Sequence, residues 1–105
     1  MLRGRLAVAI AVLLVLAVPG TAAAAKFGSR TLKQGHSGSD VKTLQKLLTR
    51  TGFVTTVDGQ FGRGTLRMVR AWEREYDRRV DGRVTRADAK ALRRAAKRGP
   101  REPGS

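Results

Sequence analysis

The sequence predicts an all-α fold, a compact three-helix bundle with paired Asp-Gly loops, preceded by a signal peptide. The first observation is a repeat, since Val-Asp-Gly at residues 57–59 recurs at residues 80–82. Asp-Gly is a strong turn dipeptide, because Asp can hydrogen-bond its own downstream backbone and Gly reaches positive φ without a Cβ penalty. The second observation is that apolar residues recur at helical spacing before, between and after these turns. The chain also has no cysteine, so a packed helical core must stabilise an exported domain of this size without disulfides.

The N-terminus has the order of a secretory signal peptide. Two arginines precede an uncharged apolar stretch at residues 6–18, and a Pro-Gly pair and small residues then lead to Ala25. We predict cleavage after Ala25, which gives an exported chain with no stable membrane span after cleavage. The alternative is an uncleaved membrane anchor, because residues 6–25 reach the roughly 20 residues that a span requires.

Composition and breaks divide the chain into four predicted segments. They are the signal peptide (residues 1–25), a polar lead-in (26–31), the folded domain (32–98) and a disordered tail (99–105), whose Gly and Pro residues cannot continue a helix. The chain has 22 Lys and Arg residues against 8 Asp and Glu residues, a net charge of +14. Because loss of the signal removes only two arginines, the mature protein stays strongly basic, and such a surface attracts polyanions.

The first helix is predicted to follow a loop of turn-forming residues and to end near Gly52. Apolar residues between Val41 and Leu48 fall at i, i+3, i+6 and i+7, which gives one buried face and a basic outer face. Ser37 or Ser39 can cap its N-terminus. Val57 and Phe61 bracket the first Asp-Gly turn, and Val84 follows the second turn as Phe61 follows the first. We expect Val57, Phe61 and Val84 to point inward and hold the loops to the core.

The second helix is predicted from about residue 62 or 63 to Asp77. Trp72 and Tyr76 lie four residues apart on its apolar face, which favours core packing over a sugar-stacking platform. The outer face carries a ridge of arginines at spacings of three and four: Arg63, Arg67, Arg70, Arg74 and Arg78.

The third helix is predicted to start at Thr85 and to extend to about Lys97. Thr85 and Asp88 are three residues apart, which resembles a capping box. Its apolar face is mostly alanine beside Leu92, so it can approach its neighbours closely.

Several motifs occur in order between Leu32 and Leu92. They are Leu32-Lys33-Gln34-Gly35, Gly38-Ser39-Asp40-Val41, Leu44-Gln45 with Leu48, Gly52-Phe53, Asp58-Gly59-Gln60-Phe61-Gly62, Thr65 and Asp81-Gly82. In this respect the chain resembles the small peptidoglycan-binding domain found beside cell-wall hydrolases, a bundle of three helices joined by Asp-Gly loops. It departs from that family at Trp72-Glu73, where a Phe-Gln pair is usual, and at Asp88-Ala89, where the third helix lacks the usual aromatic residue.

Neither a metal site nor catalysis is predicted. A zinc site needs three or four ligands, whereas His36 is the single histidine of a chain without cysteine. Asp58 and Asp81 could be read as a carboxylate pair for glycoside cleavage, but the turn role of Asp before Gly is far more common. In the resembled family, catalysis belongs to a separate partner domain. We therefore expect no enzyme activity and no cofactor.

The resemblance implies a secreted, non-catalytic module that binds peptidoglycan at the cell wall or envelope. The expected ligand-binding residues are Gln60, Arg63, Arg67, Arg70 and Arg83, and the expected loop-forming residues are Asp58, Gly59, Phe61, Gly62, Asp81 and Gly82. Two alternatives stay open: an electrostatic binder of envelope polyanions such as teichoic acids, and an envelope-targeted regulator of a separate hydrolase. Anionic wall polymers and a separate cell-wall hydrolase are further candidate partners, and no specific nucleic acid is expected.

Overall fold

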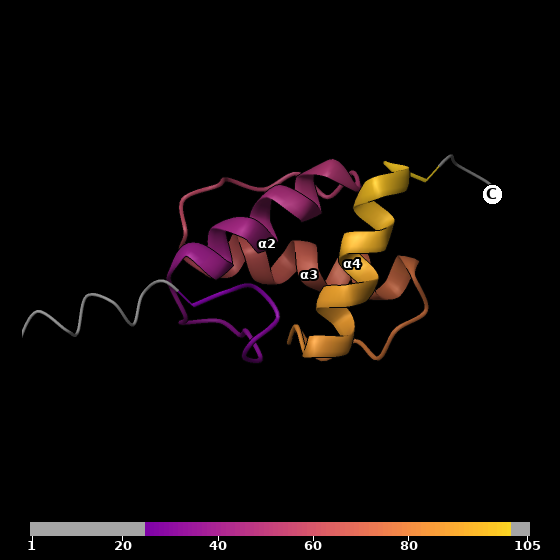
Figure 1. Cartoon of the computed structure of the whole chain (residues 1–105). Coiled ribbons are helices and arrows are strands. Elements are labelled where there is room, and N and C mark those ends of the chain that lie inside the picture. The colour runs from indigo at the N-terminus through magenta and orange to yellow at the C-terminus, as the bar shows by residue number, and fades with distance from the viewer. Residues whose placement is uncertain (1–24, 102–105) are drawn as a thin grey trace, which may run out of the picture.

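The computed structural model describes residues 25–101, and the all-α prediction is confirmed within them. The helices are α2 (Ser39–Arg50), α3 (Arg63–Glu75) and α4 (Arg86–Arg98), and this part of the chain contains no β-strand (Figure 1). Residues 1–24 of the predicted signal peptide (1–25) and residues 102–105 of the predicted tail (99–105) lie outside the described residues. No helix among the described residues has the length and apolar character that crossing a membrane requires.

The helix α2 is the centre of the packing, because it contacts both α3 and α4. Figure 1 shows α4 running steeply across the other two helices. One hydrophobic core joins all three: Phe27, Leu32, Val41, Leu44, Leu47, Leu48, Phe61, Val69, Trp72, Val84, Ala89 and Leu92. Trp72 is fully buried and stacks on Tyr76 with ring centroids 5.7 Å apart. The prediction that this aromatic pair packs with the core is thus confirmed for Trp72.

The N-terminus of α4 is capped as the local sequence predicts, whereas the N-terminus of α2 is not. Thr85 and Asp88 form the predicted capping box, in which each side chain accepts a hydrogen bond from the other's backbone N–H, at 3.1 and 3.0 Å. The predicted serine cap of α2 was wrong. Gly38 is the N-cap residue with no side-chain cap, because its φ of 139° suits glycine rather than an ordinary capping residue.

Tertiary packing decides which apolar residues around the two turns are buried and which are exposed. Phe61 and Val84 are each 2% exposed, as predicted. Val57 is 38% exposed, so the expectation that it points inward was wrong. The position that matches it in the second loop, Val80, is exposed as well, so the residue before each Asp-Gly pair stays in solvent and only the later apolar residue reaches the core.

The segment before α2 ties the two turns together. Leu32 and Val84 exchange both backbone hydrogen bonds at 2.9 Å, while Ser37 forms an isolated antiparallel bridge with Gln60. Residues 32–38, called here the pairing segment, therefore connect the loop after α2 with the loop after α3.

Both ends of the described chain also pack against the helices. Phe27 is buried, and the Arg93 guanidinium lies 5.1 Å from the centre of its ring. At the other end, the Arg101 guanidinium lies 4.1 Å from the centre of the Tyr76 ring and donates a 2.8 Å hydrogen bond to the Glu75 carbonyl.

Candidate functional site

The first Asp-Gly loop is a tight turn closed by its own aspartate. Asp58 Oδ1 accepts a hydrogen bond from the Gln60 backbone N–H at 2.9 Å, and Gly59 has a φ of 78°. The Gln60 N–H bond, and after it the Gln45 amide, hold the pKa of Asp58 below its usual value. The loop therefore keeps a carboxylate that serves the turn, as the sequence predicted for Asp58 and Gly59.

A buried amide side chain on α2 fixes this loop by hydrogen bonds. Gln45 is 1% exposed, and its Oε1 accepts a 2.8 Å hydrogen bond from the Gly59 backbone N–H. Its Nε2 lies 3.0 Å from three acceptors, which are Asp58 Oδ1, the Gln60 carbonyl and Thr65 Oγ1. A neutral amide suits this place because it can donate and accept in the same buried position.

The second loop repeats the turn. Asp81 Oδ1 accepts a 2.9 Å hydrogen bond from the Arg83 backbone N–H, and Gly82 has a φ of 72°. The Arg83 N–H bond is the main reason that the pKa of Asp81 lies below its usual value. The loop is again held by a helical side chain, since Glu73 Oε1 accepts a 2.9 Å hydrogen bond from the Gly82 N–H.

Glu73 holds the second loop with a carboxyl group, whereas Gln45 holds the first loop with an amide. Glu73 is fully buried, and its Oε2 makes no hydrogen bond with any described residue. Burial raises the pKa of Glu73 from 4.5 to about 7, with the Gly82 N–H opposing this shift and the carboxyl group of Asp81 adding to it. The second loop is therefore held by a carboxyl group that titrates far above the usual range of a glutamate.

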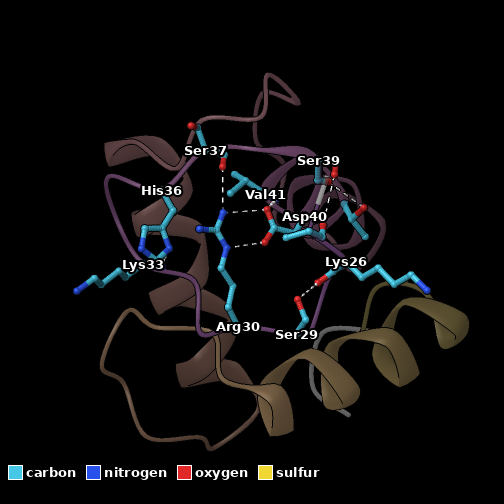
Figure 2. Close-up of polar contacts among 11 residues, drawn as sticks. Lys26, Ser29, Arg30, Lys33, His36, Ser37, Ser39, Asp40 and Val41 are labelled. Carbon is cyan, nitrogen blue, oxygen red and sulfur yellow. Dashed lines mark hydrogen bonds and ion pairs between the residues drawn. The ribbon is translucent and has the colours of Figure 1, made fainter. Parts of the chain in front are cut away.

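Arg30, two residues before the pairing segment, forms an ion pair with α2 and a hydrogen bond to that segment. Arg30 Nε lies 2.8 Å from Asp40 Oδ2 and Arg30 Nη2 lies 3.2 Å from Asp40 Oδ1, while Nη2 also donates to the Ser37 carbonyl at 3.0 Å (Figure 2). Asp40 Oδ1 accepts a further 2.9 Å hydrogen bond from the Val41 N–H. This network joins the start of α2 to the chain that bridges the loops.

The exposed candidate residues fall into separate places. Gln60 borders a hollow of about 330 Å³ at the first loop, together with Gly38, Lys42, Asp58 and Gly59, and with the serines at positions 37 and 39. Arg63, Arg67 and Arg70 line a different hollow of about 350 Å³ along α3, with Leu66 and Arg74. Arg83 is exposed on the second loop and borders neither hollow. Phe61 is buried, and Gly62 is the N-cap of α3.

Sequence reasoning did not assign site roles to Gln45, Glu73 or Arg30. Gln45 and Glu73 could have been noticed as polar residues on otherwise apolar helix faces, a pattern that often marks a buried hydrogen-bonding group. For Arg30 there was no such signal, because its partner Asp40 lies ten residues away across a loop.

The described residues offer no arrangement for metal binding. No group of three or more His, Cys, Asp or Glu side chains within residues 25–101 could hold a metal ion. His36 is half-buried in the loop before α2, where its Nδ1 accepts a 3.4 Å hydrogen bond from the Lys33 N–H. Asp58 and Asp81 each bind the backbone of their own turn.

Comparison with known proteins places this geometry among wall-binding domains. The family model for the peptidoglycan binding domain matches residues 37–92. No curated protein matches the chain.

Three solved structures are similar. The SleB N-terminal domain is 33% identical with a TM-score of 0.64, and the match covers 68% of this chain and 99% of that chain. A peptidoglycan-binding protein from Clostridioides difficile, in complex with glutamine hydroxamate, is 29% identical with a TM-score of 0.63, covering 66% of this chain and 44% of that one. A fused Zn-dependent amidase/peptidase/peptidoglycan-binding protein from Clostridium acetobutylicum is 36% identical with a TM-score of 0.59, covering 60% of this chain and 28% of that one. The chain thus spans less than half of the length of the last two proteins.

Proposed function

The chain belongs to the peptidoglycan-binding domain family, and from this membership we propose that it is a non-catalytic, secreted module that binds peptidoglycan and stays at the cell wall. The proposal goes beyond the family in three respects: the absence of catalysis, the export of the chain, and the surface that contacts the polymer. The N-terminal sequence of residues 1–25 supports export.

The observation that carries the proposal is the rigid pair of loops. Each Asp-Gly turn is held from below by a buried helical side chain, Gln45 or Glu73, and the pairing segment joins the two turns through backbone hydrogen bonds. A surface that is already ordered loses little conformational entropy when a ligand binds, which favours recognition by directional hydrogen bonds.

The hollow at the first loop is the place we assign to the glycan or stem peptide. Its rim offers the side chains of Gln60 and Lys42 beside the exposed backbone of the turn. Arg83 presents a further donor on the second loop. Polar groups that converge on a shallow polar surface fit a sugar or peptide ligand better than an apolar one.

A separate hydrolase is a second candidate partner. In the Clostridium acetobutylicum protein, a peptidoglycan-binding domain is fused to a Zn-dependent amidase/peptidase, and this chain matches 28% of that protein. We infer that a catalytic partner of this chain, where there is one, would be a separate protein or domain at the wall.

The test is co-sedimentation of the mature protein with purified peptidoglycan from which anionic polymers have been removed, at low and high salt. We expect binding that survives high salt, because Gln60 and the backbone of the turn offer directional hydrogen bonds, which ions screen less than the charge of Lys42. The double variant Gln60→Ala with Lys42→Ala should reduce the bound fraction, since both side chains border the hollow.

The matched control is Lys46→Ala, which removes an exposed positive charge from α2 outside that hollow. We expect it to bind like the parent protein. No sedimentation with stripped peptidoglycan at either salt concentration would overturn the proposed function, and an equal loss in both variants would overturn the assigned surface.

A further inference from the structure

The outer face of α3 carries a stripe of arginines that the paired loops do not use. Four exposed arginines and one leucine line a hollow of about 350 Å³, namely Arg63, Leu66, Arg67, Arg70 and Arg74. We call the four arginines the α3 stripe. The residues are spaced by four, three and four, so they share one face of the helix, and a rise of 1.5 Å per residue extends the stripe over about 16 Å.

No carboxylate among the described residues pairs with the α3 stripe. None of its arginines forms an ion pair or side-chain hydrogen bond with the described residues, and no acidic side chain lines the hollow. Four guanidinium groups on one face repel each other and raise the local positive potential, which stabilises a bound anion.

The acidic residues of the described chain are largely engaged elsewhere. Three form ion pairs with other arginines: Asp40 with Arg30, Asp88 with Arg78 and Glu75 with Arg101. Three more bind the backbone of the two loops, namely Asp58, Glu73 and Asp81. The four arginines of the α3 stripe are therefore left without a carboxylate partner among the described residues.

The loops fix the stripe in place at its first residue and near its middle. Arg63 directly follows Gly62, the last residue of the first loop and the N-cap of α3. Near the middle, the side chains of Leu66 and Arg70 lie over the second loop, since a Cβ at Gly82 would be 2.6 Å from Leu66 Cδ1 and 3.4 Å from Arg70 Nε. An elongated ligand along α3 would thus run beside the surface assigned to peptidoglycan.

We propose that the α3 stripe is a second binding surface, for a linear wall polymer that carries phosphodiester groups at regular intervals. The placement of that polymer at the wall rests on the proposed peptidoglycan function. Arginine binds phosphate through a planar fork of donors, so four of them in a row suit a chain of repeated phosphates better than a single anion.

Nucleic acid carries the same phosphates, but the hollow lacks what bases require. Proteins that bind single strands stack the bases on exposed aromatic side chains. Within residues 25–101, Leu66 is the single non-arginine residue that lines the hollow, and the neighbouring aromatic residues Phe61 and Trp72 are buried. The stripe can therefore contact a phosphate backbone, and it offers no aromatic surface to a base.

The test is a direct titration of the mature protein with a synthetic poly(glycerol phosphate) chain, which requires no peptidoglycan. If four phosphates are contacted, log K should fall with log salt with a slope of roughly −3, a loss of roughly fiftyfold between about 50 and 200 mM salt. Replacement of the four stripe arginines by Gln should weaken binding by about tenfold or more at the lower salt and flatten the slope.

The matched control removes the same number of charges from α4. Arg86, Lys90, Arg94 and Lys97 form an exposed basic stripe on that helix, and their fourfold Gln variant should lose less than about threefold in affinity. Equal losses in the two variants would overturn the proposal, because net charge alone would then explain binding.

Arg→Lys at the four α3 positions keeps the charge and should lose less than the Gln variant. If the folded Lys variant binds as tightly as the parent, charge alone explains the binding, and the role assigned to the planar guanidinium fork is refuted.

The binding of two further ligands tests which class of polymer the α3 stripe recognises. A single-stranded DNA oligomer with the same number of phosphates and vesicles of anionic lipid should bind more weakly than poly(glycerol phosphate) at the same salt. Tighter binding of either would overturn the assignment to a wall polymer. Arg74→Gln changes the one stripe arginine that the sequence did not place among the ligand-binding residues, and its sedimentation with stripped peptidoglycan should match the parent. Failure of the parent there would count against the proposed function while leaving the titration valid.

Discussion

Glu73 and Gln45 hold equivalent positions beneath the two Asp-Gly loops. Glu73 Oε1 accepts a hydrogen bond from the Gly82 N–H at 2.9 Å, and Gln45 Oε1 accepts one from the Gly59 N–H at 2.8 Å. The two side chains differ at their other terminal atom. Gln45 Nε2 donates to the aspartate of its loop, whereas Glu73 Oε2 has no hydrogen-bond partner within the described residues. A protonated Glu73 would supply the missing donor toward Asp81, which makes the second loop sensitive to pH.

We predict that the protein becomes less stable as pH rises through neutrality. The pKa of Glu73 is raised to about 7 in the folded protein from 4.5, so the folded state binds this proton more tightly than the unfolded state. The resulting stabilisation is fully present below the unfolded value and is lost as pH rises from about 4.5 through about 7, a change of roughly 2–4 kcal/mol. Urea unfolding between pH 5 and pH 8 measures it.

Glu73→Gln is the matched variant, since it restores the amide seen at Gln45. It should be more stable than the parent at pH 8, by roughly 1–3 kcal/mol, and should gain little at pH 5. Asp58 and Asp81 have pKa values below their usual value of 3.8, so neither carboxyl group titrates between pH 5 and pH 8. An unchanged pH dependence in Glu73→Gln would show that another group causes it.

Valine at either loop glycine should destabilise the fold, and Gly82→Val should be the worse of the two. Both glycines have positive φ, which costs roughly 1–3 kcal/mol for a β-branched residue. At Gly82 a Cβ would in addition lie 2.6 Å from Leu66 Cδ1, whereas at Gly59 the nearest atom is the Gly38 carbonyl oxygen at 3.4 Å. Thermal melts of the two variants report the difference.

Gly64→Ala serves as the control for this comparison. Gly64 lies in the first turn of α3, and a Cβ there meets no atom within 4 Å. Alanine should therefore stabilise the helix by about 0.5–1 kcal/mol. If both loop variants melted at the parent temperature, the account of the turns would be wrong.

Arg30→Met should destabilise the protein by about 1–2 kcal/mol. The substitution leaves the buried carboxylate of Asp40 without its ionic partner, and the half-exposed position of Arg30 limits the cost because water can replace part of the contact. Urea unfolding at pH 7 measures the loss. Lys33→Met removes a nearby exposed charge that pairs with no carboxylate among the described residues, so it should unfold like the parent (Figure 2).

The mature protein is predicted to begin near Lys26. The apolar stretch is short and is followed by Ala23-x-Ala25, which is typical of a cleaved signal. Mass spectrometry of the exported protein should give a chain that lacks residues 1–25. An intact Met1 would instead support the membrane-anchor alternative.

The sequence by itself determined the helices and the two turns, because the causes of both are local. Helical spacing of apolar residues placed α2, α3 and α4, with α3 ending two residues before the predicted Asp77. The positive φ of Gly59 and Gly82 was predictable from Asp-Gly alone, as was the capping box of Thr85. These features depend on the chemistry of a few neighbouring residues, so short motifs suffice to predict them.

Only the tertiary structure decided how the loops are held. The side chains of Gln45 and Glu73 act on turns that lie 14 and 9 residues away, and Leu32 pairs with Val84 across most of the domain. The burial of Phe61 and the exposure of Val57 follow from which side of the turn faces the core. Such relationships depend on which distant elements pack together, and a buried polar group is satisfied only once its partner has been brought into place by the fold.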